Sequence, residues 1–119
     1  MATGYTIVNR ALRIARILDA TDTAQGAQGA DALQTLNALL AEWHEADIRL
    51  PDYSLANLEA EFGGDAADLE AVSYALAQRL CSEYGTELMP EAQRQSVISF
   101  ARLRSRYFQP ISPVRAEYF

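Results

Sequence analysis

The stretch Ala32-Leu-Gln-Thr-Leu-Asn-Ala-Leu-Leu-Ala-Glu-Trp43 decides the fold of this chain, because its apolar side chains recur at the spacing of a helix. Five of them share one helical face: Leu33, Leu36, Leu39, Leu40 and Trp43. The pattern predicts a helix from about Asp31 to Ala46, with the Asp31 carboxylate at the end where the helix dipole favours negative charge. A helix with one apolar face must bury that face against other elements, which favours an all-α domain.

Two further helices are predicted, one on either side of this stretch. The first runs from about Thr6 to Asp19, and Thr6 is its expected N-cap. The second runs from about Ala66 to Tyr84. Asp65 offers a cap at its start, and Gly85 is placed to end it because glycine accepts the left-handed conformation at a helix C-terminus.

A last helix is expected from Pro90 to about Tyr107. Proline is well tolerated at a first helical position, where its missing N–H costs nothing. The apolar side of this helix is expected to carry Val97, Phe100, Leu103 and Tyr107. Together the apolar faces of the four helices predict a small bundle. Its core is expected to contain Leu12, Leu36, Leu40, Trp43, Leu76, Leu80 and Phe100.

The connections between these helices differ in kind. Residues Thr21–Gly29 hold two glycines and small polar side chains, which predicts a loop. The segment from Ile48 to Gly64 contains Pro51, which blocks a helix. It fits an extended arm, a short hairpin or a ragged helical turn, and long ordered connections are usually functional.

The chain closes on Gln109-Pro-Ile-Ser-Pro-Val-Arg-Ala-Glu-Tyr-Phe119, which is apolar and aromatic, whereas a disordered end is usually polar and charged. The prolines forbid helix and lower the entropy cost of docking an extended peptide. We therefore divide the chain into a bundle, residues 1–108, and a C-terminal arm, residues 109–119. The arm either anchors on a partner or folds back on its own bundle. Its anchor candidates are Pro110, Ile111, Pro113, Val114, Tyr118 and Phe119.

The composition of the chain limits the classes of function that it can have. The 119 residues fit one domain, half of them are apolar, and no apolar run approaches the ~20 residues that span a bilayer. The N-terminus lacks the layout of a signal peptide, so we expect a soluble intracellular protein. The net charge of −6 argues against tight binding of duplex DNA. All ten basic residues are arginine, which reflects either ion pairs within and between subunits or a GC-rich genome.

A catalytic interpretation finds little support. His44 is the one histidine, and neighbouring Glu45 points to a different side of the helix. Cys81 is the one cysteine and sits in an apolar stretch, so we expect a buried structural thiol and no zinc site. Gly26-Ala-Gln-Gly29 lacks the lysine and the preceding strand of a phosphate-binding loop. We expect no catalytic residue, cofactor or metal.

Arg10, Arg13 and Arg16 fall three residues apart and are expected to share an outer helix face. They either pair with acidic residues of a neighbouring subunit or grip phosphates, and the acidic balance of the chain favours the first. Tyr53, Leu55 and Phe62, in the segment after the tryptophan helix, are further candidates for contact with a neighbouring subunit or a tail protein.

The tryptophan helix and the residues after it carry a resemblance to a known family. The pattern from Ala32 to Trp43, followed by Ala46-Asp-Ile-Arg-Leu50, resembles the head-to-tail connector proteins of tailed bacteriophages, also called adaptor or head-completion proteins. Members typically show a Leu-Asn-x-(Leu/Met)-Leu-x-x-Trp helix, a short turn and an Ile-x-Leu step. The Ala11-Leu12 helix and the Tyr74–Gly85 helix also fit, so that the resemblance covers about Thr6 to Arg106. Family members often have glycine where this chain has Asp47.

The resemblance implies a homo-oligomeric, dodecameric ring beneath the portal of the capsid, in the neck of the virion. Such a ring extends the channel for double-stranded DNA without sequence-specific binding and offers a surface to tail proteins. An acidic channel wall repels DNA and lets it slide. The alternative is a small helical DNA-binding protein, such as a regulator or a small terminase-like subunit. It needs a basic recognition helix, which this sequence does not clearly show.

Overall fold

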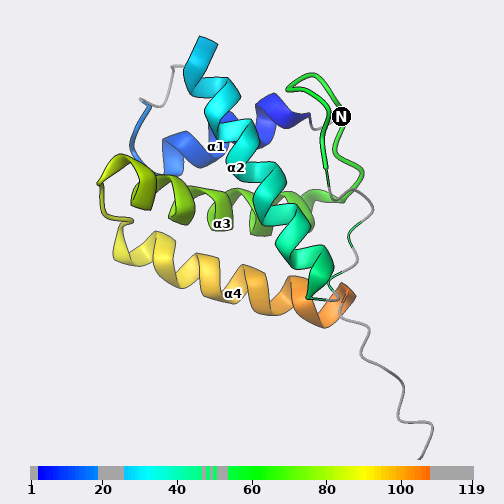
Figure 1. Ribbon diagram of the computed structural model, residues 1–119. Helices are drawn as coiled ribbons and strands as arrows, with labels where there is room; N and C mark the ends of the chain where they lie inside the picture. The colour runs from blue at the N-terminus through cyan, green and yellow to red at the C-terminus, as the bar shows by residue number, and fades with distance from the viewer. Residues whose placement is uncertain (1–2, 19–25, 47, 49, 51–53, 108–119) are drawn as a thin grey trace, which may run out of the picture.

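The computed structural model describes residues 3–18, 26–46, 48, 50 and 54–107, and these residues form four helices. The helices are α1 (Gly4–Ile14), α2 (Gly26–Glu45), α3 (Ala66–Tyr84) and α4 (Pro90–Tyr107). α3 lies in the middle and contacts the other three, with α4 running beside it in the opposite direction and α2 crossing it (Figure 1). Within the described ranges there is no strand, so the predicted all-α bundle of four helices is confirmed.

α1 begins two residues earlier than predicted. Its N-cap is Thr3, and Thr6 occupies the third helical position. The Thr6 N–H donates to the Thr3 hydroxyl at 3.4 Å, and the Thr3 N–H donates back to the Thr6 hydroxyl at 3.2 Å. This reciprocal arrangement is a capping box, in which each side chain satisfies a backbone donor that the helix leaves unpaired. Thr6 therefore does help to cap α1, but not as the N-cap residue.

α1 also ends at Ile14 instead of Asp19. Arg16 adopts a left-handed conformation with φ of 61°, and its N–H donates to the Arg13 carbonyl at 3.0 Å. The next N–H, of Ile17, donates to the Leu12 carbonyl at 2.9 Å. These two bonds form a Schellman motif, which terminates a helix and satisfies its last carbonyls. Arginine takes the place that glycine usually fills, so the end of α1 carries no local stop signal in the sequence.

α2 starts at Gly26, so the second half of the predicted Thr21–Gly29 loop is helical. This stretch holds two glycines, which disfavour a helix interior, so helix propensity did not predict the extension. The other predicted boundaries agree with the structure. α3 begins after a capping box of Asp65 and Asp68, and it ends at Gly85, whose φ is 72°. α4 begins at Pro90 and runs to Tyr107, as predicted.

The core collects apolar side chains from all four helices and from the connection between α2 and α3. Six of the seven predicted core residues are buried: Leu12, Leu36, Leu40, Trp43, Leu76 and Leu80. Phe100 only packs against this core, and Val97 is 70% exposed. α4 turns Ser96 and Leu103 toward α3 instead, and Val97 follows Ser96 by the ~100° step of a helix. The prediction that Val97 shares one apolar side of α4 with Leu103 was therefore wrong, because Leu103 is fully buried.

The connection after α2 is an irregular loop that folds over the start of α1. The Asn37 side chain of α2 receives the Leu55 N–H at 2.8 Å and donates to the Leu55 carbonyl at 2.9 Å. Further along, the carbonyls of Leu58 and Ala60 accept the first N–H groups of α1, from Tyr5 at 2.8 Å and Gly4 at 3.0 Å. The loop thus satisfies donors that α1 cannot pair internally.

Candidate interaction surface

A mostly apolar opening on the described surface lies between the C-terminal half of α2 and α4. This hollow has a volume of about 490 Å³, with α3 as its floor. Leu39 and Trp43 of α2 line one wall, and Val97 and Phe100 of α4 line the other. The rings of Trp43 and Phe100 have centroids 5.3 Å apart and are tilted by 45°. Aromatic and aliphatic side chains at the rim of a hollow are typical of a docking surface.

A second hollow of about 500 Å³ shares Val97 and Phe100 with the first and continues along α4 to Arg104 and Ser105. We call the two hollows together the α2–α4 groove. It follows one side of α4 toward the residue where α4 ends and the C-terminal arm begins. Because Val97 and Phe100 belong to both hollows, their substitution affects the whole groove.

Several polar groups at the edge of the groove are engaged within the chain. The Ser96 hydroxyl donates to the Gln78 side-chain carbonyl at 3.3 Å. The Arg79 guanidinium makes two bonds to the Glu42 carboxylate, at 2.6 and 3.0 Å. These hydrogen bonds lower the pKa of Glu42 and raise that of Arg79. The middle of the groove is left to apolar side chains.

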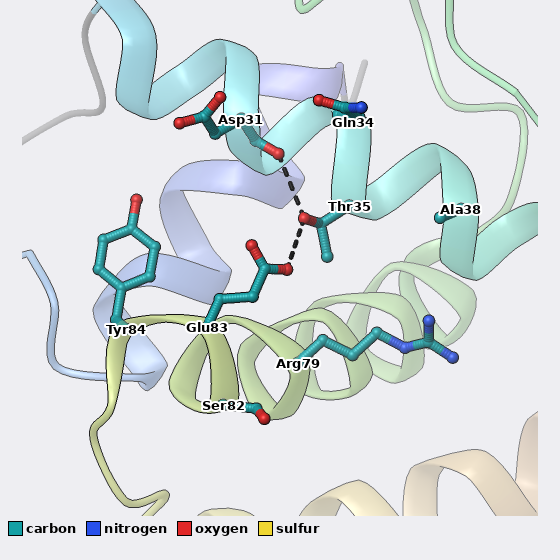
Figure 2. A pocket seen from close by; sticks show the side chains of 8 residues that line it. All are labelled: Asp31, Gln34, Thr35, Ala38, Arg79, Ser82, Glu83 and Tyr84. Carbon is teal, nitrogen blue, oxygen red and sulfur yellow. Dashed lines mark hydrogen bonds between the residues drawn. The ribbon is translucent and has the colours of Figure 1, made fainter.

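A wider polar cleft of about 750 Å³ separates the N-terminal half of α2 from the end of α3 (Figure 2). The Thr35 hydroxyl lies 2.8 Å from the Glu83 carboxylate and 3.2 Å from the Asp31 carbonyl. Arg79 extends away from Thr35 and Glu83 in this view, on the side of its partner Glu42. The cleft is lined by two acidic side chains, Asp31 and Glu83, and by the hydroxyls of Thr35, Ser82 and Tyr84.

The predicted arginine face is not continuous. Arg10 lies 2.8 Å from the Glu70 carboxylate of α3 and 5.9 Å from the centre of the Tyr74 ring. Arg16 follows the end of α1, and its backbone turns it off the helical face. Arg10 and Arg13 line a shallow outer hollow of α1. Arg10 is thus engaged within its own chain, and its contact with a neighbouring subunit stays a prediction.

Two of the three loop candidates are also used within the chain. Leu55 is 3% and Phe62 is 2% exposed, and both belong to the core. They are therefore packing residues, not the surface contacts that we expected, because the loop folds inward over α1. Tyr53 lies outside the described residues, as do the arm candidates Pro110, Ile111, Pro113, Val114, Tyr118 and Phe119.

Sequence reasoning missed a buried polar cluster where α4 meets the start of α3. The Asp68 side chain is fully buried, and it accepts a short bond from Arg106 and one from the Tyr107 hydroxyl at 2.5 Å. Asp68 also accepts the Asp65 N–H at 3.2 Å as part of its capping box. A buried carboxylate is tolerated when it is paired and hydrogen-bonded, as Asp68 is here. We call these four residues the Asp68 cluster.

The Asp68 cluster perturbs the acidity of Tyr107. The hydrogen bond to Asp68, followed by burial and the negative charges of Asp68 and Asp65, raises the pKa of Tyr107 to about 12. The same carboxylate raises the pKa of Arg106, mainly through its hydrogen bond. The cluster joins the last turn of α4 to the first turn of α3. It therefore fixes the point from which the C-terminal arm leaves the bundle.

The single cysteine and histidine can now be placed. Cys81 is 3% exposed, with its sulfur 3.9 Å from the Ala15 carbonyl, so the predicted buried thiol is confirmed. His44 is half-buried in the last turn of α2. Among the described residues no group of three or more His, Cys, Asp or Glu side chains is arranged to hold a metal ion. None of the four helices is long and apolar enough to cross a membrane.

Comparison with known proteins gives no family for this chain. No model of a protein family matches the sequence, and no curated protein matches it significantly.

Proposed function

We propose that this chain is a structural head-to-tail connector of a tailed bacteriophage. It forms a dodecameric ring beneath the portal, extends the DNA channel and offers the tail its attachment surface in the neck of the virion. The role is structural and not enzymatic, with no cofactor. The proposal rests on the resemblance of the tryptophan helix and the residues that follow it.

The observation that best supports the proposal is that these residues form one packed unit. The large apolar positions of the Leu-Asn-x-Leu-Leu-x-x-Trp pattern and of the Ile-x-Leu step are all buried: Leu36, Leu39, Leu40, Trp43, Ile48 and Leu50. The short turn after the helix is closed by the Ile48 N–H, which donates to the Trp43 carbonyl at 2.9 Å. Asn37, the polar residue of the pattern, holds the loop through Leu55. Each position of the pattern thus has a physical role in one supersecondary unit.

The surface has features that a ring subunit requires. A closed ring is built from heterologous contacts, in which two different surfaces of each subunit meet. The apolar α2–α4 groove and the polar outer face of α1, with Tyr5 39% exposed beside Arg13, are chemically different candidates. Each subunit carries a net charge of −6, so a ring of many subunits is strongly acidic. An acidic channel repels DNA and lets it slide through without sticking.

The arm is the proposed portal anchor, and truncation after Tyr107 tests that role. The truncated chain should keep the helical circular dichroism of the full chain and lose binding to the portal protein encoded in the same genome. A truncated chain that still binds portal would assign the anchor to the bundle. An unfolded one would place the arm in the core.

DNA binding remains the alternative, and Arg13 on the outer face of α1 is the feature that favours it. Fluorescence anisotropy with a short duplex at low and physiological salt separates the two functions. A DNA-binding protein should show measurable affinity that falls steeply with salt, because each phosphate contact releases counterions. A connector should show only weak binding at low salt.

A further inference from the structure

We propose that the α2–α4 groove is the docking site for the C-terminal arm of the same chain, residues 109–119, before the arm engages the portal. The groove is an observed feature, and the arm is the occupant that fits it in chemistry and in reach. The intramolecular contact does not depend on the connector function, whereas the later release to a portal rests on it.

The chemistry of the two surfaces matches. The groove presents Trp43, Phe100 and a valine, Val97, that is 70% exposed. The arm carries apolar and aromatic side chains at intervals, namely Ile111, Val114, Tyr118 and Phe119. Covering Val97 and Phe100 with such side chains removes apolar surface from water, which is the main driving force of peptide docking.

The reach is short. Val97 lies ten residues before Tyr107 on α4, and a helix rises ~1.5 Å per residue, which separates the two by ~15 Å. An extended chain covers this distance in about five residues at ~3.3 Å each. The chain also needs about two residues after Tyr107 to reverse its direction. Counting seven residues from Tyr107 brings Val114 level with Val97. On the way the arm passes Phe100 and its neighbour Trp43, and the remaining residues, up to Phe119, reach the part of the groove lined by Leu39.

The groove also begins at the right place. Ser105 and Arg104 line its nearer end, within one turn of the start of the arm. The Asp68 cluster holds that turn against α3 through Arg106 and Tyr107. A short, fixed connection gives a tethered peptide a high effective concentration at its site, so that modest contacts are enough to dock it.

Disulfide trapping in the full chain tests the proposal. Val97→Cys combined with Val114→Cys places one thiol in the groove and one at the predicted level of the arm. The matched control is Ala67→Cys with Val114→Cys. Ala67 is exposed and lines a hollow together with Arg106, near the start of the arm but on the opposite side of α4. The native thiol of Cys81 is buried and is present in both variants, so any contribution from it is the same in both.

Under mild oxidation we expect an intramolecular disulfide to form at least about tenfold faster in the Val97→Cys pair than in the Ala67→Cys pair, because docking raises the effective concentration. Equal rates would show an arm that is not docked. A disulfide between two chains, seen as a dimer on a non-reducing gel, would assign the groove to the arm of a second copy. Either result overturns the proposal.

A second measurement uses no new thiol. Trp43 is the one tryptophan of the chain and lines the groove, so its fluorescence reports the occupant. Val97→Glu should undock the arm and shift Trp43 emission to longer wavelength, and Ala67→Glu should leave it unchanged. An unchanged spectrum for Val97→Glu would contradict docking. Because neither test contains portal, their failure is distinguishable from failure of the connector function.

Discussion

The side chain of Asn37 pairs with the backbone of Leu55 in the way that one strand pairs with another. It receives the Leu55 N–H at 2.8 Å and donates to the Leu55 carbonyl at 2.9 Å. This pair anchors the loop that connects α2 to α3 and covers the start of α1, and it explains why a polar residue sits among the leucines of α2.

Replacing Asn37 by alanine should reduce the free energy of unfolding by ~2 kcal/mol, because two part-buried backbone groups lose their partner. Asn37→Asp should cost at least as much, since its carboxylate still accepts from the Leu55 N–H but now faces the Leu55 carbonyl. Urea denaturation followed by circular dichroism measures both changes. An Asn37→Ala variant with an unchanged free energy of unfolding would show that water replaces the amide without cost.

Alkaline pH should weaken the Asp68 cluster. The pKa of Tyr107 is about 12 in the folded chain, above its unperturbed value of ~10. The folded state therefore holds this proton more tightly, and the resulting stability is complete below pH ~10 and is lost as the pH rises toward about 12. Tyr107→Phe removes the group and should be less stable than the native chain at pH 7. The difference in urea midpoint between the two should shrink between pH 10 and 12. A constant difference would argue against the Tyr107–Asp68 bond.

Arg16→Gly should stabilise the chain by ~1 kcal/mol, because glycine takes the left-handed conformation without the steric penalty that arginine bears. Ala15→Gly is the matched control. Ala15 has a right-handed helical conformation with φ of −75°, so glycine there should be destabilising. Thermal unfolding distinguishes the two directions. A loss of stability in Arg16→Gly would mean that the arginine side chain contributes more than its backbone costs.

Gly4→Ala should destabilise the chain by ~1–2 kcal/mol, although alanine is the better helix former. A Cβ at this position would lie 3.1 Å from the Leu58 Cα and 3.1 Å from the Leu58 carbonyl oxygen, and both are backbone atoms that cannot rotate away. Denaturant unfolding gives the sign directly. A stabilised variant would show that the loop is free to move off α1.

The helix boundaries that could be predicted from the sequence are those with a local chemical signal. Gly85 ends α3 and Pro90 begins α4 because each imposes its own backbone conformation. The end of α1 escaped prediction, because Arg16 reaches its left-handed conformation through bonds to earlier carbonyls and not through an intrinsic preference. Val97 was misplaced for a related reason, since which side of α4 meets α3 depends on how the two helices pack.

The polar contacts could not be predicted, because they join residues far apart in the chain. The cap at Asp65 was predicted, but the partners of Asp68, Arg106 and Tyr107, follow 38 and 39 residues later in the chain. Asn37 and Leu55 are separated by 18 residues, and the loop between them has no periodic pattern. The groove is likewise a product of helix packing. The sequence indicated the apolar arm, but only the structure shows a surface near its origin.

The central claim, that this chain is a portal-binding connector, is tested most directly by native mass spectrometry of the full chain alone and mixed with the portal protein of the same genome. The account predicts a discrete complex in which twelve copies of the chain join one portal ring, whatever the state of the chain alone. Persistent monomer or dimer with no portal-bound species would contradict it.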